Sequence, residues 1–241
     1  MDLCKKKKAL SDEDFEKSYG RHWIWAALDP ESKLLINFFV GQRTLDACRL
    51  FIKDLVSRIK TKPLFTSDEL PHYQTALLEN FSHLETQPKT GQRGRPKNPK
   101  VIVDPELIYA TVHKTRDNGK VVKVERNVIF GDPKLIDQII EASDVSKSIN
   151  TSFIERSNLT FRNHCRKLTR KTLCFAKEKQ ALEAQVNIST TYYNFSKPHR
   201  SLTLKDTGGK QIKRTPAMAA NIIDRVWPIK EILAYPMINN N

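Results

Sequence analysis

A short segment around Glu155 combines one acid with basic and amide side chains. The spacing i, i+3, i+7 and i+11 predicts that Glu155, Asn158, Arg162 and Arg166 lie on one face of a helix that continues to Arg170. A carboxylate can hold a divalent metal ion, and guanidinium groups beside it can hold phosphate. This combination suits the cutting or joining of a nucleic acid strand.

The same segment also allows a structural interpretation. Ser152 and Glu155 have the spacing of a capping box, in which both side chains satisfy backbone N–H groups at the start of a helix. Glu155 would then only hold the first helical turn together. The segment alone favours this capping role over the chemical role.

A second acid at the end of a strand-like stretch shifts the balance toward chemistry. Leu64–Asp68 is typical of a short buried strand that ends in an aspartate. The C-terminal edge of parallel strands is the usual place for ligands in α/β proteins. The elements expected to position this acid are a strand over His22–Leu28, a turn at Asp29–Lys33, a strand over Leu34–Val40 and helices over Thr44–Ile59 and Tyr73–Phe81.

Several motifs follow one another in the order typical of a known family. They are Trp23–Asp29, Val40–Thr44, Thr66–Asp68, Thr151–Arg162, Tyr193–Phe195 with Pro198, His199 and Leu202, and Thr215–Ala217. With these motifs the chain resembles a bacterial insertion-sequence transposase with an RNase H-like DDE catalytic domain. The resemblance covers most of residues 20 to 235.

The resemblance implies a metal-dependent site. It assigns the second catalytic acid to Asp68, the third to Glu155, and the basic residue that follows the glutamate to Arg162. Such transposases use two Mg²⁺ (or Mn²⁺) ions, held by the acids, to activate the attacking oxygen and stabilise the leaving oxygen. No nucleotide cofactor is implied.

The first acid of the family pattern is the point where this sequence departs from it. The family acid belongs on a strand just ahead of Lys5–Lys8, in an Asp-Glu pair followed by an aromatic residue. Here the chain begins Met1-Asp2-Leu3-Cys4, without that pair. We expect the first strand to be mostly missing and the family acid to lie upstream of Met1, which would leave the chain inactive. The alternative is that Asp2 serves; Asp29, before Pro30, is better explained as a turn residue.

The charge of the chain points to a polyanionic partner. The formal net charge is +14 and the pI is about 9.6. The positive charge gathers in Lys5–Lys8, Arg93–Lys100 and Arg156–Lys171, whereas a merely basic protein would scatter it. The residues expected to contact the DNA backbone are Arg156, Arg162, Arg166, Lys167, Arg170 and Lys171.

A basic linker over Gln87–Lys100 separates the two acids. Its Arg93-Gly-Arg95-Pro96 tetrapeptide resembles a minor-groove arm, in which Arg93 and Arg95 would enter A·T-rich DNA. A plain solvated linker is the favoured alternative. Beyond it we expect strands over Val101–Val103, Leu107–His113 and Val121–Phe130, a hairpin turn at Asp117–Gly119 and a helix over Leu135–Ala142.

The predicted fold is α/β and RNase H-like, with a mixed sheet, flanking helices and a β-rich insertion. A later helix over Glu178–Tyr193 is expected to bury Leu182, Val186, Ile188 and Tyr192, and Cys48 is expected in the core. The predicted domains are residues 1–83 (first part of the core), 84–150 (linker and hairpin insertion), 151–196 (helical completion with Glu155) and 197–241 (tail).

The predicted function is DNA transposition by strand cleavage and strand transfer. The partners implied are the DNA ends of the insertion element, target DNA and further copies of the chain on DNA, with no membrane; the expected location is the cytoplasm, on the nucleoid. Two alternatives stay open. One is a catalytically incomplete DNA-binding remnant of a transposase, and the other is an RNase H-like nuclease that acts on RNA–DNA hybrid.

Overall fold

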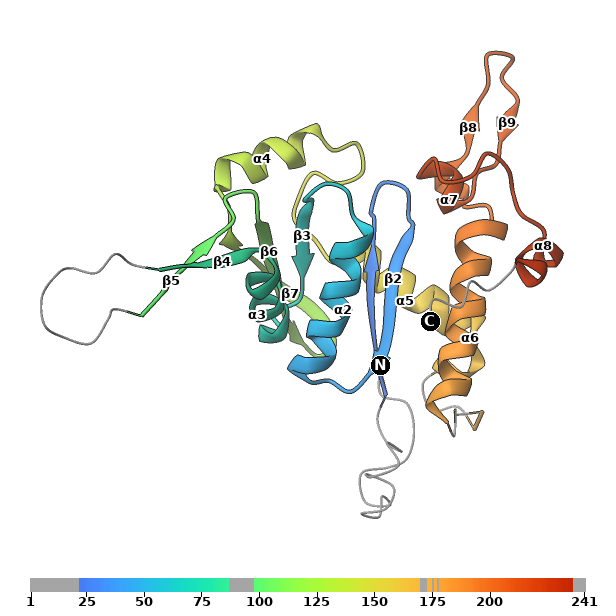
Figure 1. Cartoon of the computed structure of the whole chain (residues 1–241). Coiled ribbons are helices and arrows are strands. Elements are labelled where there is room, and N and C mark those ends of the chain that lie inside the picture. The colour runs from blue at the N-terminus through green and yellow to red at the C-terminus, as the bar shows by residue number, and fades with distance from the viewer. Residues whose placement is uncertain (1–21, 87–97, 170–172, 175, 177, 236–241) are drawn as a thin grey trace, which may run out of the picture. The chain divides into compact units, whose positions relative to one another are not determined.

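A computed structural model describes residues 22–86, 98–169, 173–174, 176 and 178–235. The chain divides into two compact units. Unit 1 comprises Met1–Arg43 and Ser152–Asn241, and unit 2 comprises Thr44–Thr151. Both units contain helices and strands, so the predicted mixed α/β class is confirmed. Figure 1 shows the elements of both units.

Unit 1 starts with an antiparallel hairpin of β1 (Trp23–Leu28) and β2 (Leu35–Gly41). Asp29 organises the turn, because its carboxylate accepts hydrogen bonds from the backbone N–H groups of Glu31 (3.1 Å) and Ser32 (3.0 Å). The prediction that Asp29 is a turn residue is therefore confirmed.

Two helices, α5 (Ser152–His164) and α6 (Lys179–Thr191), pack against this hairpin and lie beside it in Figure 1. Apolar side chains at helical spacing form the contact, as hydrophobic burial requires. The buried core of unit 1 consists of Leu35, Val40, Phe161, Cys165, Leu168, Ala176, Leu182, Val186 and Tyr193.

The end of α6 differs from the sequence prediction. Ile188 was expected in the core, but its side chain is 56% exposed. The buried side of α6 carries Leu182, Val186 and Thr190, which align at i, i+4 and i+8, and Ile188 falls on another side. The chain then continues as a π-helical segment, η3 (Tyr192–Ser196).

The remaining elements of unit 1 are short. Their ends are set by local signals such as Thr215, which is fully buried and accepts a hydrogen bond from the backbone N–H of Met218 (3.3 Å). These elements are η2 (Arg166–Leu168), η4 (Arg200–Leu202), β8 (Leu204–Lys205), β9 (Gln211–Ile212), α7 (Pro216–Ala219) and α8 (Ile229–Ala234).

Unit 2 contains a three-stranded sheet in the order β3-β6-β7. β3 (Leu64–Ser67) pairs in parallel with β6 (Ile108–Asp117), and β6 pairs antiparallel with β7 (Lys120–Phe130). Asn118 and Gly119 connect β6 to β7 and both have positive φ (46° and 79°), as a two-residue hairpin turn requires. The predicted hairpin is confirmed. The expectation that β3 is a buried strand is wrong, because its residues are half-buried or exposed.

Helices cover this sheet. α4 (Pro133–Ala142) places Ile136, 1% exposed, against Ile108, Ala110 and Val112 of β6. The helix α2 (Leu45–Arg58) starts at Thr44, whose hydroxyl accepts a hydrogen bond from a backbone N–H in the first turn. It buries Ala47, Cys48, Phe51, Ile52 and Leu55.

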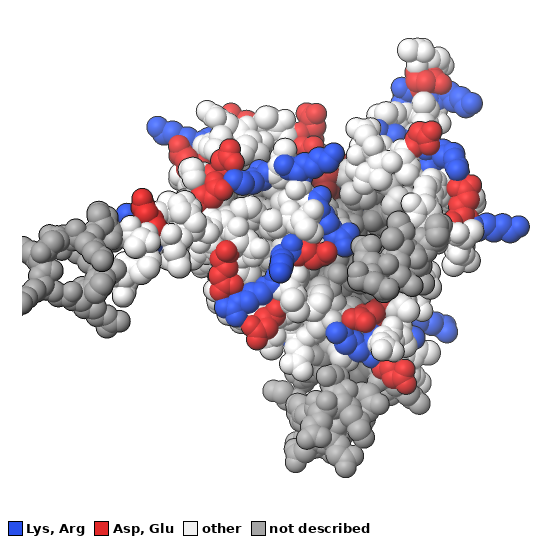
Figure 2. Space-filling model, viewed as in Figure 1, with Lys and Arg blue, Asp and Glu red and all other residues white. Residues whose placement is uncertain are grey.

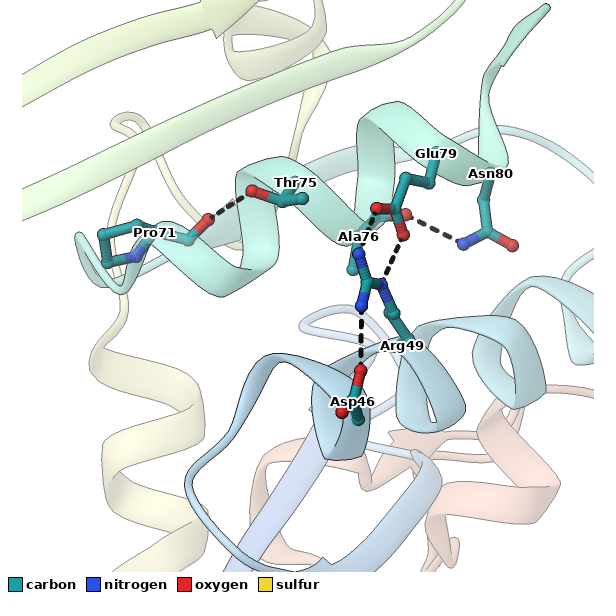
Figure 3. Close-up of polar contacts among 7 residues, drawn as sticks. All are labelled: Asp46, Arg49, Pro71, Thr75, Ala76, Glu79 and Asn80. Atoms are coloured by element: carbon teal, nitrogen blue, oxygen red, sulfur yellow. Dashed lines mark hydrogen bonds and ion pairs between the residues drawn. The ribbon is translucent and has the colours of Figure 1, made fainter.

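A polar contact joins α2 to its neighbour α3 (Pro71–Asn80). Arg49 of α2 donates to Asp46 one turn earlier (2.8 Å) and to the two oxygens of Glu79 on α3 (2.6 and 2.8 Å), as Figure 3 shows. The guanidinium therefore makes a two-pronged bond to Glu79, which fixes how α3 lies against α2.

The other strands of unit 2 form a separate ribbon of β4 (Ser82–Glu85) and β5 (Lys100–Val103), which pair antiparallel. Among the described residues the strands thus form four separate sheets, three of them two-stranded. The mixed α/β character is established, and the assignment to the RNase H-like fold stays a prediction, as does the predicted division into four domains.

Candidate functional site

Asp68 lies immediately after β3, at the C-terminal end of a strand that runs parallel to β6. Its side chain is exposed, and one carboxylate oxygen lies 3.4 Å from the backbone N–H of Leu70. Ser67 links this end of β3 to β6, since its hydroxyl lies 2.7 Å from the Tyr109 hydroxyl. The sheet thus presents the acid at the edge where the sequence analysis expected it.

A second acid lies next to Asp68 and has a histidine partner. Glu69 Oε2 lies 2.5 Å from His113 Nδ1, and both side chains are partly exposed. The nearby Tyr109 is buried, and this burial is the main reason that its pKa rises to about 12. Tyr109 therefore stays protonated and acts as a hydrogen-bonding group. The sequence left His113 without a role, and its pairing depends on strands that are distant in the chain.

Helix α5 begins at Ser152 and carries Glu155 in its first turn. Ser157 and Phe161 are the buried residues of α5. They are four positions apart and therefore mark one side of the helix as the buried side. Glu155 is exposed and Arg162 is half-buried. At 100° per residue, Glu155 and Arg162 lie within about 20° of each other around the helix, as the predicted spacing requires. Both point away from the buried side.

The helix ends earlier than predicted. It stops at His164, where we expected it to run to Arg170. Cys165 has extended backbone angles (φ −120°, ψ 105°) and is 1% exposed, and the following turn η2 buries Leu168. Burial of these two side chains requires the bend, so Arg166 lies in η2 and not on the Glu155 face. The i+11 prediction for Arg166 is therefore wrong.

The other residues singled out from the sequence fall in different environments. Arg156 and Arg166 are exposed, and Lys167 is half-buried. Asp2, Arg93, Arg95, Arg170 and Lys171 lie outside the described residues.

The described residues contain no group of three or more His, Cys, Asp or Glu side chains arranged to hold a metal ion. Asp68 belongs to unit 2 and Glu155 belongs to unit 1, so the surroundings of each carboxylate are described for its own unit. Both are exposed acids with hard oxygen donors, which is the donor type that Mg²⁺ prefers.

Residues of the tail motifs have mainly structural roles. The buried Asn194 accepts a hydrogen bond from the Leu35 N–H (3.1 Å) and donates one to the Leu35 carbonyl (3.0 Å). Tyr193 is 5% exposed and its ring centroid lies 5.3 Å from that of Phe161, so its ring belongs to the core of unit 1. His199 contacts the Ser201 hydroxyl through Nδ1 (2.9 Å).

The face of the molecule drawn in Figure 2 carries charged side chains of both signs. On the face shown in Figure 2, Lys and Arg side chains alternate with Asp and Glu. Two of the three charge clusters predicted from the sequence lie wholly or largely outside the described residues. None of the helices in the described residues is long and apolar enough to cross a membrane.

Residues 131–196 match the model of a family described as IS1 transposase. The matched segment includes α4, α5 with Glu155 and Arg162, and α6. Comparisons with curated proteins and with solved structures gave no match. The family match confirms the resemblance to insertion-sequence transposases and supports a transposase role for this chain.

Proposed function

We propose that this chain is a DNA transposase that cleaves and joins DNA strands in a metal-dependent reaction. The match over residues 131–196 carries the proposal, because it contains the exposed acid Glu155 and the half-buried Arg162 on one side of α5. The order of elements that leads to Asp68 adds support, since hairpin, helix and strand follow one another as in an RNase H-like fold. Nucleic acid is also the partner that the net charge of +14 favours.

In this proposal Asp68 and Glu155 are metal ligands. Their carboxylates would hold Mg²⁺ or Mn²⁺. A bound pair of such ions would lower the pKa of the attacking hydroxyl and stabilise the negative charge on the leaving oxygen. Arg162 would hold a phosphate of the substrate strand, because a guanidinium forms paired hydrogen bonds with phosphate oxygens. On the DNA, several copies of the chain would act together to bring the element ends to the target.

Cleavage of DNA that carries both ends of the encoding element tests the proposal. Mg²⁺ should support cleavage by the chain itself if Asp2 serves as the first acid, and otherwise only after a strand that carries the family acid is added ahead of Met1. A chelator should abolish the cleavage in either case. Asp68→Asn and Glu155→Gln should each reduce cleavage to background, because an amide is a much weaker metal ligand than a carboxylate. Asp137→Asn and Glu141→Gln are matched controls on the exposed part of α4, and they should cleave like the parent chain.

Three other outcomes would contradict the proposal in different ways. DNA binding without cleavage under any metal, also after the strand with the family acid is added, would indicate a DNA-binding remnant. Cleavage of an RNA–DNA hybrid but not of the element ends would indicate a nuclease. Full activity in the Glu155→Gln variant would assign Glu155 to helix capping.

A further inference from the structure

One side of α5 is lined by basic groups from other parts of unit 1. Phe153, Arg156 and His164 share this side, because positions i, i+3 and i+11 of a helix align. The ammonium group of Lys33, in the turn between β1 and β2, lies 4.1 Å from the centroid of the Phe153 ring. At the other end of the helix, Lys197 Nζ lies 2.7 Å from His164 Nε2. This side therefore has a cation at each end and Arg156 between them.

A fourth basic residue, His199, belongs to the same group. It is half-buried, and its Nδ1 lies 2.9 Å from the Ser201 hydroxyl. Its ring meets the buried Tyr193 edge-on at 6.3 Å. Partial burial, and then the positive charges of the three cations named above, hold the pKa of His199 below its usual value. In the free protein His199 therefore gives up its proton more readily than an isolated histidine does.

The acids close to these cations form no ion pair with them among the described residues. Asp29 and Glu31 are the acids whose charges act on Lys33, and the carboxylate of Asp29 already accepts the N–H groups of its own turn. Glu155 precedes Arg156 in the chain and points about 100° away around the helix.

These four residues differ from several other cations of the protein in their lack of an ion pair with a described carboxylate. In the described part of the chain, Arg49, Lys62 and Lys179 each form an ion pair with a carboxylate. No carboxylate of the described residues forms such a pair with Lys33, Arg156, Lys197 or His199. Like charges held together without a carboxylate paired to any of them are a favourable place for an anion.

We propose that Lys33, Arg156, Lys197 and His199, here named the α5 basic row, bind the phosphate backbone of one DNA strand, and that His199 takes up a proton when the strand binds. The inference that an anion binds here follows from the charges alone, and the choice of DNA rests on the proposed function. Successive cations along a helix side suit a chain of phosphates better than one small anion.

The α5 basic row differs from the DNA path expected from the sequence. That path used Arg162, which lies with Glu155 on another side of α5, and Arg166, which lies in η2. Lys33 and Lys197 were not anticipated, because they reach α5 from segments far away in the chain. Binding at the α5 basic row would hold the strand along a second side of the helix that carries the proposed metal ligand.

Proton uptake follows from the charges. Phosphate groups add negative charge beside His199 and so raise its pKa in the complex above that in the free protein. Between these two pKa values, binding takes up a proton, and affinity must rise as the pH falls, by at most about tenfold per pH unit for one proton. Below the pKa of the free protein the affinity should become independent of pH.

The experiment measures the affinity of the full chain for a short labelled duplex, without divalent metal, over a range of pH and salt. The parent chain should bind more tightly as the pH falls from the pKa of His199 in the complex toward its lower pKa in the free protein. His199→Gln should remove this pH dependence. Lys197→Gln should lower the slope of log affinity against log salt by about one unit. His83→Gln and Lys53→Gln, exposed residues of unit 2, are the matched controls.

NMR titration of the His199 ring gives an independent readout. The His199 signal, assigned by its loss in His199→Gln, should titrate at higher pH with the duplex present than without it. Inorganic phosphate alone should produce a smaller shift in the same direction. An identical titration with and without duplex would overturn the proposal, as would pH-dependent binding that survives in His199→Gln.

These readouts separate the α5 basic row from the proposed catalytic function. Neither affinity without metal nor the His199 titration requires strand cleavage. Loss of cleavage with an intact proton linkage would overturn the transposase chemistry alone. Cleavage by the parent chain without any proton linkage would overturn the α5 basic row alone.

Discussion

The side chain of Asn194 makes two hydrogen bonds to the backbone of β2, as a neighbouring strand would. Its amide pairs with both the N–H and the carbonyl of Leu35, so it satisfies two backbone groups of β2 on the side that does not face β1. Asn194 is itself 6% exposed, so water cannot replace these bonds without rearrangement. The residue therefore joins the segment after α6 to the hairpin that carries Lys33.

Asn194→Ala should be strongly destabilising. The substitution leaves a buried donor and a buried acceptor of Leu35 unsatisfied, at a cost of about 3 kcal/mol. Urea unfolding followed by circular dichroism measures this cost. Asn187→Ala, at an exposed position of α6, is the control and should change the stability by less than about 0.5 kcal/mol. A cost for Asn194→Ala as small as that of the control would contradict the strand-like role.

The sequence predicted single residues well where one local pattern decides their environment. Asp29 precedes Pro30 in a turn, and Cys48 lies on an apolar helical face; both predictions are confirmed. Local patterns could not show that Lys33 and Lys197 meet α5, because that requires the packing of three distant segments. Nor could they show that the tail motif residue Asn194 has a structural role.

At the scale of elements, periodicity predicted the longer helices and strands, but it missed the end of α5 and the short elements β4, β8, β9, α7 and α8. The hairpin of β6 and β7 was found because Asn118-Gly119 is a specific turn signal. The early end of α5 was missed because the polar and basic sequence continues to be compatible with a helix beyond His164. Only the burial of Cys165 and Leu168 shows why the backbone must bend there.

Two glycines at the ends of β7 should respond differently to an added methyl group. Both Gly119 and Gly131 have positive φ (79° and 98°), so alanine is strained at either position. A Cβ at Gly119 would meet nothing within 4 Å, whereas one at Gly131 would lie 3.3 Å from the Ile108 Cα and the Leu107 carbonyl oxygen. The connection from β7 to α4 is therefore closely packed against β6.

We expect Gly119→Ala to cost about 1 kcal/mol, from backbone strain alone. Gly131→Ala should cost roughly 2 kcal/mol or more, since the backbone of β6 cannot move away easily. The measurement is the free energy of unfolding in urea. Gly208→Ala is the control, because Gly208 does not have positive φ and its nearest contact is a side-chain oxygen at 3.4 Å. Equal costs at Gly119 and Gly131 would show that the contact with Ile108 relaxes freely.

At the scale of the whole molecule, the proposed catalytic acids come from two units that are built differently. Asp68 follows the strand β3 in unit 2, and Glu155 lies in the first turn of the helix α5 in unit 1. The sequence could suggest both acids because each lies in a recognisable motif. It could not establish the sheet order, since β3 pairs with β6 across a long stretch of chain that includes the basic linker.

With a net charge of +14, every variant is expected to bind DNA non-specifically. A specific role of two residues is therefore tested by comparison with a variant that loses the same charge elsewhere. Arg93→Ala with Arg95→Ala removes two charges from the basic linker. Lys53→Ala with Lys60→Ala removes two charges from exposed positions of unit 2 and serves as the matched control. Both double variants lose the same formal charge, and any difference between them reports the position of the charges.

The two interpretations of the linker predict different results. If Arg93 and Arg95 enter the minor groove, their removal should weaken binding to A·T-rich duplexes more than to G·C-rich duplexes, because the narrow A·T minor groove attracts arginine most strongly. If the linker is only a charged tether, both duplexes should lose affinity equally, and the salt slope should fall by about two units. Binding of each variant to both duplexes over a series of salt concentrations measures these effects. An A·T preference that is lost equally in the Lys53 and Lys60 control would assign the preference to overall charge and rule out the groove-binding arm.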